Sequence, residues 1–443
     1  MMKNNRKGNF KFFDKLLLIT LFSFAIRVGV SFPSLFNASN FLRLDSGGFI
    51  PGMMSFDWGA RAPFYSGIMW IFQHVFDNFY LAAAIFGIIC SSASVFIIGL
   101  IGRELSGEKC GLIAAVLLGL NVTSIGVAPL ILSDTFFAFA VGLQILFAVK
   151  FYRNGGAKEL LGAIVCGCSA TLIRSINLPI MLISMPILIL LKWQNSKKSY
   201  LYIGLNYLIL LIFIIPFAVA NFCKNAGFTI EYNAPKALIH NKVAIIAHAE
   251  NRPSAEILDQ EMSQIEDLIE NKKLSIAERN EVIVQNYLAA IKKYPYSFAV
   301  SHFPNILIMT PDLPSFCENL GVTSGDKGTL SVIRKEGIVA GIKHYFGEQA
   351  TKVLVLALPL LLVTMAGYVG CLIALINCIC RREYKLLIIW LLFSLLYVII
   401  PGPIIMPRYQ LAALFLIFGF AGGMGRVSAV NRNCDTGINA EVF

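Results

Sequence analysis

Six ionisable residues lie within or beside long apolar stretches of the sequence. Three are acids and three are arginines: Asp45, Asp57, Arg61, Asp134, Arg174 and Arg408. Charges in such places are costly, so they usually line a cavity or pair with one another, and they are functional candidates by default. Together they predict a cationic cleft that also contains carboxylates.

Several of these residues also have a purely structural interpretation. Asp134 could be an acid in the first turn of a helix, Asp57 an ordinary loop acid, and Arg174 a side chain that extends to lipid headgroups. Asp45 and Arg61 are harder to explain in this way, because they flank a loop rich in glycine and aromatic residues between two apolar segments.

Motifs for cofactor binding are missing from the sequence. The histidines lack H-E-x-x-H spacing, and there is no Walker A loop and no G-x-G-x-x-G within a strand–helix unit. The ten cysteines lack the paired spacing of a structural zinc site. We therefore expect no cofactor, although a divalent metal would be compatible with the carboxylates. Cys223 and Cys317, in the large polar region, could form a disulfide in an oxidising compartment.

The composition is that of a membrane protein. Of the 443 residues, 57% are hydrophobic and 14% are charged, and the mean hydropathy is +0.70. These values are outside the balance of soluble domains, so most of the chain must be solvated by lipid. The net charge of +11 comes largely from lysines and arginines in short loops. It therefore does not indicate a nucleic-acid partner.

Ten stretches supply the roughly 20 largely apolar residues that a spanning helix needs. They are 14–33, 79–102, 110–128, 133–151, 158–175, 176–192, 200–222, 351–380, 384–401 and 407–426. The first could instead be a secretory signal, but no convincing cleavage site follows it, which favours a retained anchor. Arg27 within it could extend to headgroups.

Positive charge alternates between the loops and indicates the orientation. Cytoplasmic loops retain lysine and arginine, and this rule puts both termini in the cytoplasm. The alternation requires that 63–77 does not cross, and we expect it to be an amphipathic helix at the outer interface. The candidate acids and arginines then face outward. The prediction is a multi-pass protein of the plasma (bacterial inner) membrane with an extracytoplasmic active site.

The predicted fold class is an all-α polytopic membrane protein with about ten transmembrane helices and a small, mainly helical extracytoplasmic domain. The N-terminal transmembrane domain covers 1–222 and includes the first outer loop, 34–78. The extracytoplasmic domain covers 223–350, and 351–443 forms the last transmembrane helices with a short cytoplasmic tail. Within 223–350 we expect a helix from 253 to 270. Ser275 and Glu278 form a capping box that predicts a second helix, ending near Tyr294.

Five short segments, in this order, resemble the GT-C class of membrane glycosyltransferases. Within this class, they resemble bacterial relatives of the protein O-mannosyltransferases and of the lipid A aminoarabinose transferase. The segments are Arg43-Leu44-Asp45, Arg61-Ala62-Pro63-Phe64-Tyr65, Gly102-Arg103-Glu104-Leu105, Leu132-Ser133-Asp134 and Arg408-Tyr409-Gln410-Leu411. The resemblance covers 33–195 and 384–426. It departs from the family where Pro-Pro is reduced to Ala62-Pro63 and where Asp45 is followed by Ser-Gly-Gly.

The resemblance implies a reaction. Family members take a sugar from a polyprenyl monophosphate carrier and pass it, with inversion, to an acceptor that can be a lipid, a glycan or a protein. Asp45 would be the catalytic base that removes the acceptor proton. Asp134 would be a second catalytic residue that positions the acceptor or holds Arg61.

The same resemblance implies a set of substrate-binding residues. Arg61, with Arg408 as the second choice, would bind the lipid phosphate, because a guanidinium group matches phosphate oxygens in a bidentate way. Tyr409 would pack on the sugar or the carrier. The predicted substrate-binding residues are Arg61, Arg408, Tyr409, Asp57 and Arg174.

Two other functions share this architecture. A transporter or flippase for lipid-linked glycans would also be polytopic, but neither an internal repeat nor a pair of interrupted helices is evident. An O-antigen ligase or polymerase would use diphosphate-linked donors. It would be favoured if residues of the outer domain, such as Arg252, His302 or Arg334, were essential while Asp45 was not.

Overall fold

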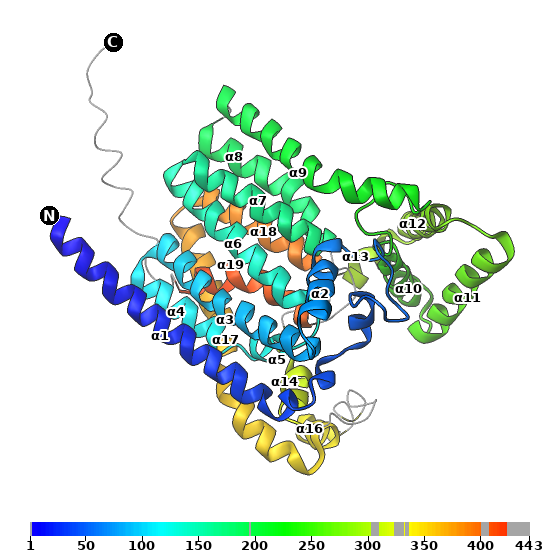
Figure 1. Cartoon of the computed structure of the whole chain (residues 1–443), viewed down its shortest axis with the longest axis horizontal. Helices are drawn as coiled ribbons and strands as arrows, with labels where there is room; N and C mark the ends of the chain where they lie inside the picture. Colours follow the sequence, from blue (N-terminus) through cyan, green and yellow to red (C-terminus); the bar gives the residue numbers. More distant parts are fainter. Residues whose placement is uncertain are drawn as a thin grey trace.

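The chain folds as a bundle of helices in a computed structural model, which describes residues 2–194, 196–302, 310–322, 332, 336–399 and 407–422. Within these residues there is no β-strand, and one isolated β-bridge joins Trp58 to Arg61. Figure 1 shows long helices packed side by side, with α10, α11 and α12 gathered beyond one end of the bundle. The predicted all-α polytopic fold class is confirmed.

The N-terminal half supplies most of the bundle. Its α-helices are α1 (Met2–Leu35), α2 (Pro63–Val75), α3 (Phe79–Ser106), α4 (Glu108–Gly119), α5 (Val122–Val127), α6 (Ser133–Asn154), α7 (Ala157–Ile173), α8 (Met185–Trp193) and α9 (Lys197–Cys223). Two 3-10 turns, η1 (Ala38–Phe41) and η2 (Leu44–Gly48), lie in the first loop. The turn η3 (Ser175–Asn177) and the π-helical turn η4 (Ile180–Ser184) separate α7 from α8.

The C-terminal half contains the polar region and the last membrane helices. The polar region holds α10 (Lys236–Glu250), α11 (Ser254–Lys272), α12 (Ile276–Lys293), α13 (Pro295–His302), α14 (Leu313–Asn319) and α16 (Ile338–Phe346). After it come the turn η6 (Gly347–Gln349), α17 (Ala350–Cys380), α18 (Tyr384–Ile399), the turn η7 (Pro407–Gln410) and α19 (Leu411–Ala421). In Figure 1, α10 and α12 lie at the end of the bundle where α9 finishes.

Six helical segments are long and apolar enough to cross a membrane. They are Lys11–Leu35, Phe79–Ser106, Ser133–Asn154, Ser175–Trp193, Lys197–Cys223 and Ala350–Cys380. The other four predicted spans are also helical, but over the described residues their helices are shorter. Large apolar side chains of α9, such as Leu201 and Ile212, are exposed as lipid-facing residues would be. The chain is an integral multi-pass membrane protein.

The prediction of one continuous helix over 110–128 is wrong, because the chain breaks between α4 and α5. The side chain of Asn121 accepts a hydrogen bond from the N–H of Ser124 (2.8 Å) and so caps the first turn of α5. Asparagine is among the preferred N-cap residues, since its side chain satisfies an amide that the helix leaves unpaired. The Asn121 amide also donates to Thr364 Oγ1 (3.3 Å), which fixes the break against α17.

Arg27 lies beside this break, and its side chain is fully buried. The guanidinium donates to Ser91 Oγ (2.7 Å), to Ser124 Oγ (2.7 Å) and to the carbonyl of Gly119 at the end of α4 (3.2 Å). These acceptors belong to α3, α5 and α4. The alternative in which Arg27 extends to headgroups is therefore wrong, because the break in the helix supplies acceptors inside the protein.

The helix α19 forms the centre of the bundle. All of its residues from Leu411 to Ala421 are buried, and it packs against α3, α4, α6, α17 and α18. A Cβ atom added to Gly142 of α6 would come within 2.4 Å of the Phe415 ring, and one added to Gly367 of α17 within 2.4 Å of the Phe418 ring. These close approaches fix α19 and, with it, the preceding turn η7.

The helix α2 is too short to cross a bilayer and lies on the bundle as expected for an amphipathic helix. It begins at Pro63, a residue suited to the first helical position. Tyr65 and Met69 are buried, whereas Trp70 and Val75 are exposed. The helix packs against α3 and α7. This placement agrees with the prediction that 63–77 does not cross.

The predicted helices of the polar region are confirmed. Helix α11 begins at Ser254 and ends at Lys272, close to the expected 253–270. The Ser275 hydroxyl accepts from the N–H of Glu278 (3.3 Å), and the Glu278 carboxylate accepts from the N–H of Ser275 (2.8 Å). This capping box opens α12, which ends before Tyr294.

One helix of the polar region, α14, is packed into the bundle. It lies against α5 and α1, and the Asn319 amide donates to the carbonyl of Gly126 (2.6 Å). Cys317 of α14 is buried and Cys223 is exposed, and both thiols are free, so the disulfide considered from the sequence is not formed. The predicted domain boundaries at 223 and 350 stay a prediction.

Candidate active site

The first loop is tied to the beginning of α6, and this tie brings two of the predicted carboxylates together. The N–H of Ile131 donates to the carbonyl of Phe41 (3.1 Å), and the hydroxyl of Ser46 donates to the carbonyl of Ile131 (2.7 Å). The carboxylates of Asp45 and Asp134, far apart in the sequence, are consequently close enough to share an arginine.

Arg408, in the turn η7 just before α19, is the arginine that they share. It donates a hydrogen bond to Asp45, and its Nε lies 3.7 Å from Asp134 Oδ2. Arg174 donates a hydrogen bond to the other oxygen of Asp134. The Asp134 side chain is only 4% exposed. Asp45, Arg408, Asp134 and Arg174 thus form a continuous chain of alternating charges that joins the first loop, η7, α6 and the end of α7.

Tyr409 lies against two of these arginines. The guanidinium carbon of Arg174 is 4.9 Å from the centroid of its ring, and that of Arg408 is 5.7 Å away. Cation–π contacts of this kind hold a guanidinium over an aromatic face. In this structure the Tyr409 ring therefore supports the arginines. Its predicted contact with a sugar or carrier stays a prediction.

Arg61 lies next to Asp45, at the solvent-exposed end of this chain of charges. Its guanidinium lies 3.9 Å from Asp45 Oδ1 and 3.7 Å from Glu231 Oε1, and its carbon Cζ is 5.6 Å from the Phe49 ring centroid. The side chain is 37% exposed and makes no hydrogen bond to the residues that the structure describes. Gly48 of the first loop packs beside this side chain, and a Cβ there would lie 3.4 Å from Arg61 Nε, an ordinary van der Waals contact.

Three arginines and three carboxylates therefore meet at one place, and we call this group the charge centre. Its members are Asp45, Arg61, Asp134, Arg174, Glu231 and Arg408. Five of them are residues singled out from the sequence. The formal charges of the six residues cancel, so an anion entering the centre competes with the carboxylates for an arginine.

Glu231 is the member that sequence reasoning missed. It lies in the polar region, where acids are common, and no motif marks it. The only available signal was its position a few residues after the end of α9. Its carboxylate accepts a hydrogen bond from Ser175 Oγ (2.9 Å), and its side chain is only 12% exposed.

Asp57, a predicted substrate-binding residue, lies outside the charge centre. It pairs with Lys224 Nζ (3.1 Å) and accepts a hydrogen bond from the hydroxyl of Tyr232. Burial acts to raise the pKa of Asp57, but the hydrogen bonds from Tyr232 and Lys224 outweigh it and hold the pKa below its usual range. In this structure Asp57 fastens the first loop to the end of α9.

The turn that carries Arg408 is held by α17 and by the segment before α14. The Gln410 amide nitrogen donates to the carbonyl of Thr310 (2.8 Å), and its oxygen accepts from the Tyr368 hydroxyl (2.5 Å). Arg43 of the first loop pairs with Glu318 of α14 (2.6 Å). The polar region therefore contributes to the positions of two neighbours of the charge centre, the first loop and η7.

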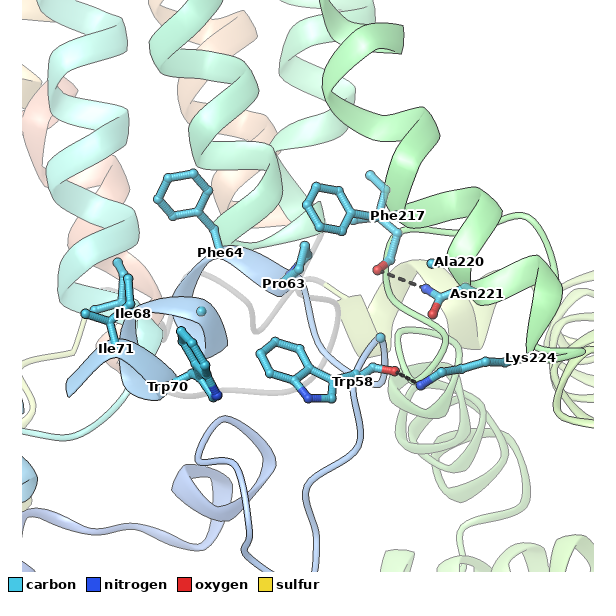
Figure 2. A pocket seen from close by; sticks show the side chains of 13 residues that line it. Trp58, Pro63, Phe64, Ile68, Trp70, Ile71, Phe217, Ala220, Asn221 and Lys224 are labelled. Carbon is cyan, nitrogen blue, oxygen red and sulfur yellow. Dashed lines mark hydrogen bonds between the residues drawn. The ribbon is translucent and has the colours of Figure 1, made fainter. Parts of the chain in front are cut away.

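An apolar pocket lies between α2 and the end of α9, beside the charge centre. Its volume is about 540 Å³, and it is lined by Trp58, Gly59, Pro63, Phe64, Gly67, Ile68, Trp70, Ile71, Phe217, Ala220, Asn221, Lys224 and Ile230. Figure 2 shows the rings of Trp58 and Trp70 next to each other, with Lys224 at the edge. The lining residues Gly59 and Pro63 are close neighbours of Arg61 in the sequence. Ile230, another lining residue, directly precedes Glu231 in the sequence.

The charge centre is not a recognisable metal site. Among the described residues, no group of three or more histidines, cysteines and acids is arranged to hold a metal ion. Asp45 and Asp134 each accept a hydrogen bond from an arginine, and Glu231 faces one. The cations that face the carboxylates in this structure are therefore arginines.

This site lies in a chain that is similar to a known family of membrane glycosyltransferases. Residues 60–219 match the model of the dolichyl-phosphate-mannose-protein mannosyltransferase family. The matched segment includes Arg61, Asp134 and Arg174 of the charge centre. The match confirms the predicted resemblance to this class of membrane proteins.

The chain is also similar to solved structures of oligosaccharyltransferase from one archaeal organism. The oligosaccharyltransferase AglB from Archaeoglobus fulgidus, in complex with an inhibitory peptide and a dolichol-phosphate, is 14% identical, with a TM-score of 0.45 over 92% of this chain. The apo form of the oligosaccharyltransferase from the same organism is 15% identical, with a TM-score of 0.47 over 93% of this chain. The chain spans about half the length of these enzymes, covering 50% of each. No curated protein matches it.

Proposed function

We propose that the protein transfers a sugar from a polyprenyl-phosphate carrier to an extracytoplasmic acceptor, which is a lipid, a glycan or a protein. The observation that carries the proposal is Arg61, a half-exposed guanidinium without hydrogen bonds to the described residues, standing next to an apolar pocket. A carrier of this kind has an apolar tail and an anionic head. The pocket suits the tail, and Arg61 suits the head.

The charge centre has the groups that such a transfer needs. As the acceptor oxygen or nitrogen attacks the anomeric carbon, the bond to the phosphate oxygen breaks and the carrier phosphate leaves with the electron pair. Arg61 would neutralise the charge that develops on this phosphate, and fixed cations of this kind are often the largest catalytic contribution. Attack opposite the leaving group gives inversion at the anomeric carbon.

Asp45 is proposed as the general base that takes the acceptor proton. Its carboxylate is 40% exposed, so an acceptor can reach it, while a hydrogen bond from Arg408 fixes its orientation. A positioned base of this type contributes about 10² to 10⁴ in rate. Asp134 would act through Arg174 and Arg408, which it holds in place. Arg408 Nε is buried without a hydrogen bond, which makes Arg408 the second candidate for the phosphate.

The location and the cofactor requirement are part of the same proposal. The charge distribution of the loops supports a plasma membrane protein with the charge centre on the extracytoplasmic side. Because arginines already face the three carboxylates, we propose that the reaction uses no cofactor. Transfer should then persist at an unchanged rate after treatment with a metal chelator.

The test is transfer of radiolabelled sugar from polyprenyl-phosphate donors by purified protein in nanodiscs. Wild type is compared with Asp45→Asn, Arg61→Ala and, as a control, Glu266→Gln on the exposed side of α11. The proposal expects donor-dependent product with wild type and the control, and a loss of at least about 100-fold in both site variants. If wild type consumes only diphosphate-linked donors, the ligase or polymerase function replaces this one. If it moves intact lipid-linked glycan across the membrane without transfer, it is a flippase.

A further inference from the structure

Glu231 is held in the charge centre by the polar region. The N–H of Tyr232 donates to the carbonyl of Gly59 (3.0 Å), and the N–H of Asn233 donates to the carbonyl of Ala60 (3.2 Å). The residues that follow Glu231 thus run beside the loop residues that precede Arg61. This backbone pairing places the Glu231 carboxylate opposite the guanidinium.

The start of α12 fixes the same segment from the other side. The amide of Asn280 donates to the carbonyl of Tyr232 (2.7 Å), and the N–H of Ala277 donates to the carbonyl of Asn225 (3.1 Å). Ala60, Ala226 and Tyr232 are buried together, with Ile276 packed against them. The position of Glu231 is therefore set by a packed and hydrogen-bonded unit.

Glu231 differs from the other two carboxylates in the number of arginines with which it forms an ion pair. Asp45 pairs with Arg408 as well as Arg61, and Asp134 pairs with Arg174 and Arg408. Within the described residues, the only ion pair of Glu231 is with Arg61. Its remaining polar contact is the hydroxyl of Ser175.

An anion that takes Arg61 therefore removes the one ion-pair partner that Glu231 has among the described residues, and leaves it only the longer-range attraction of Arg174. The carboxylate is mostly buried, and a buried charge without a partner is unfavourable. This cost is incurred only when Arg61 turns to the anion. It lowers the affinity of the centre for the phosphate and favours its release.

We propose that Glu231 is a positioning residue that competes with the carrier phosphate for Arg61 and so limits how tightly the spent carrier is bound. The proposal rests on the proposed function, in which that phosphate is the leaving group. After transfer, the polyprenyl phosphate carries more negative charge than the donor. Return of Arg61 to Glu231 helps to displace it, and the cycle can restart.

The test measures binding of polyprenyl phosphate to the full chain in nanodiscs, together with kcat and KM for the sugar donor. The Glu231→Gln variant keeps the shape of the side chain and removes its charge, and Glu266→Gln makes the same change on the exposed side of α11. We expect Glu231→Gln to bind polyprenyl phosphate tighter by about three- to tenfold, the effect of losing one partly exposed competing ion pair. Its KM should fall and its kcat should not rise.

A cycle with Arg61→Ala separates competition from a structural effect. In the Arg61→Ala background there is no guanidinium to compete for, so Glu231→Gln should change the affinity by less than about twofold. Unchanged or weaker binding by a folded Glu231→Gln would overturn the proposal, as would an equal effect in both backgrounds. If Glu231→Gln does not fold, Glu231→Asp is measured instead, and its shorter side chain should give a smaller increase in affinity for polyprenyl phosphate. If the affinity of Glu231→Asp does not increase, the proposal is equally overturned.

Failure of the proposed function gives a different pattern. In that case wild type neither binds polyprenyl phosphate nor uses its sugar derivatives, whatever residue stands at position 231. If wild type does both and Glu231→Gln behaves like the Glu266→Gln control, the function stands and only the role of Glu231 is lost.

Discussion

Removal of the Asp134 charge should destabilise the protein through two arginines at once. One oxygen of the carboxylate accepts a hydrogen bond from Arg174, and the other lies 3.7 Å from Arg408 Nε. At an effective dielectric constant of about 20, two unit charges at this separation attract by roughly 4 kcal/mol. Desolvation offsets part of that gain, whereas breaking a buried pair costs about 3–5 kcal/mol. Because both arginines are partly exposed, we expect Asp134→Asn to cost about 2–4 kcal/mol.

The assay is reversible unfolding in mixed micelles by titration with a denaturing detergent. A double-mutant cycle of Asp134→Asn and Arg174→Gln isolates the pair from other effects of each substitution. We expect a coupling energy of about 1–3 kcal/mol, the range found for contacting residues of one ion-pair network. A coupling energy below about 0.5 kcal/mol would refute the view that Asp134 anchors the arginines, and would leave Asp134 as a first-turn acid of α6.

Three further outcomes follow from the structure. Gly142→Val and Gly367→Val should each lower the unfolding free energy by about 1–3 kcal/mol, because the new side chains collide with Phe415 and Phe418, whereas Gly204→Val, with open space around it, should have little effect. The pKa of Asp57 is lowered, so its contacts stabilise the fold above about pH 4 and lose this effect as the pH falls through the lowered pKa. The difference in unfolding free energy between wild type and Asp57→Asn, present at pH 7, should therefore shrink steadily as the pH falls below about 4. A Cβ added at Gly67 meets no neighbour within 4 Å, so the side chain of Gly67→Leu should occupy the apolar pocket. This variant should raise KM several-fold for long polyprenyl donors but not for short-chain analogues. Equal changes of KM for both kinds of donor would exclude the pocket as the tail site.

The helical architecture was predictable because its signals are local. Runs of about 20 apolar residues and the Ser275–Glu278 capping box depend on neighbours in the sequence. The break at Asn121 was missed because an apolar run does not reveal whether one buried asparagine caps a new helix. The burial of Arg27 was missed for a related reason. Its acceptors on α3, α4 and α5 are contributed by tertiary packing, which hydropathy does not report.

The charge centre was predictable in part for a physical reason as well. Charges at the edges of apolar segments must find partners, so Asp45, Asp134, Arg174 and Arg408 could be expected to meet. Glu231 gave no such signal, since an acid in a polar region is ordinary until the backbone pairing with the first loop brings it to Arg61. The ion pair of Asp57 with Lys224 could not be foreseen, because the two residues are far apart in the sequence, and the substrate-binding role of Asp57 stays a prediction.

The serine-lined site of Arg27 has a consequence for membrane insertion. Residues 14–33 leave the ribosome before Ser91, Gly119 and Ser124 have been made, so the guanidinium first enters the membrane without any of these acceptors. A central arginine costs roughly 2.5–3.5 kcal/mol at insertion. This cost favours a shallow or shifted position of the first helix, with Arg27 near the headgroups, until α3, α4 and α5 arrive. The final depth of the first helix in the bilayer is therefore set late, when these three helices have been made and supply the acceptors. Substitution of the serines should trap the shallow state.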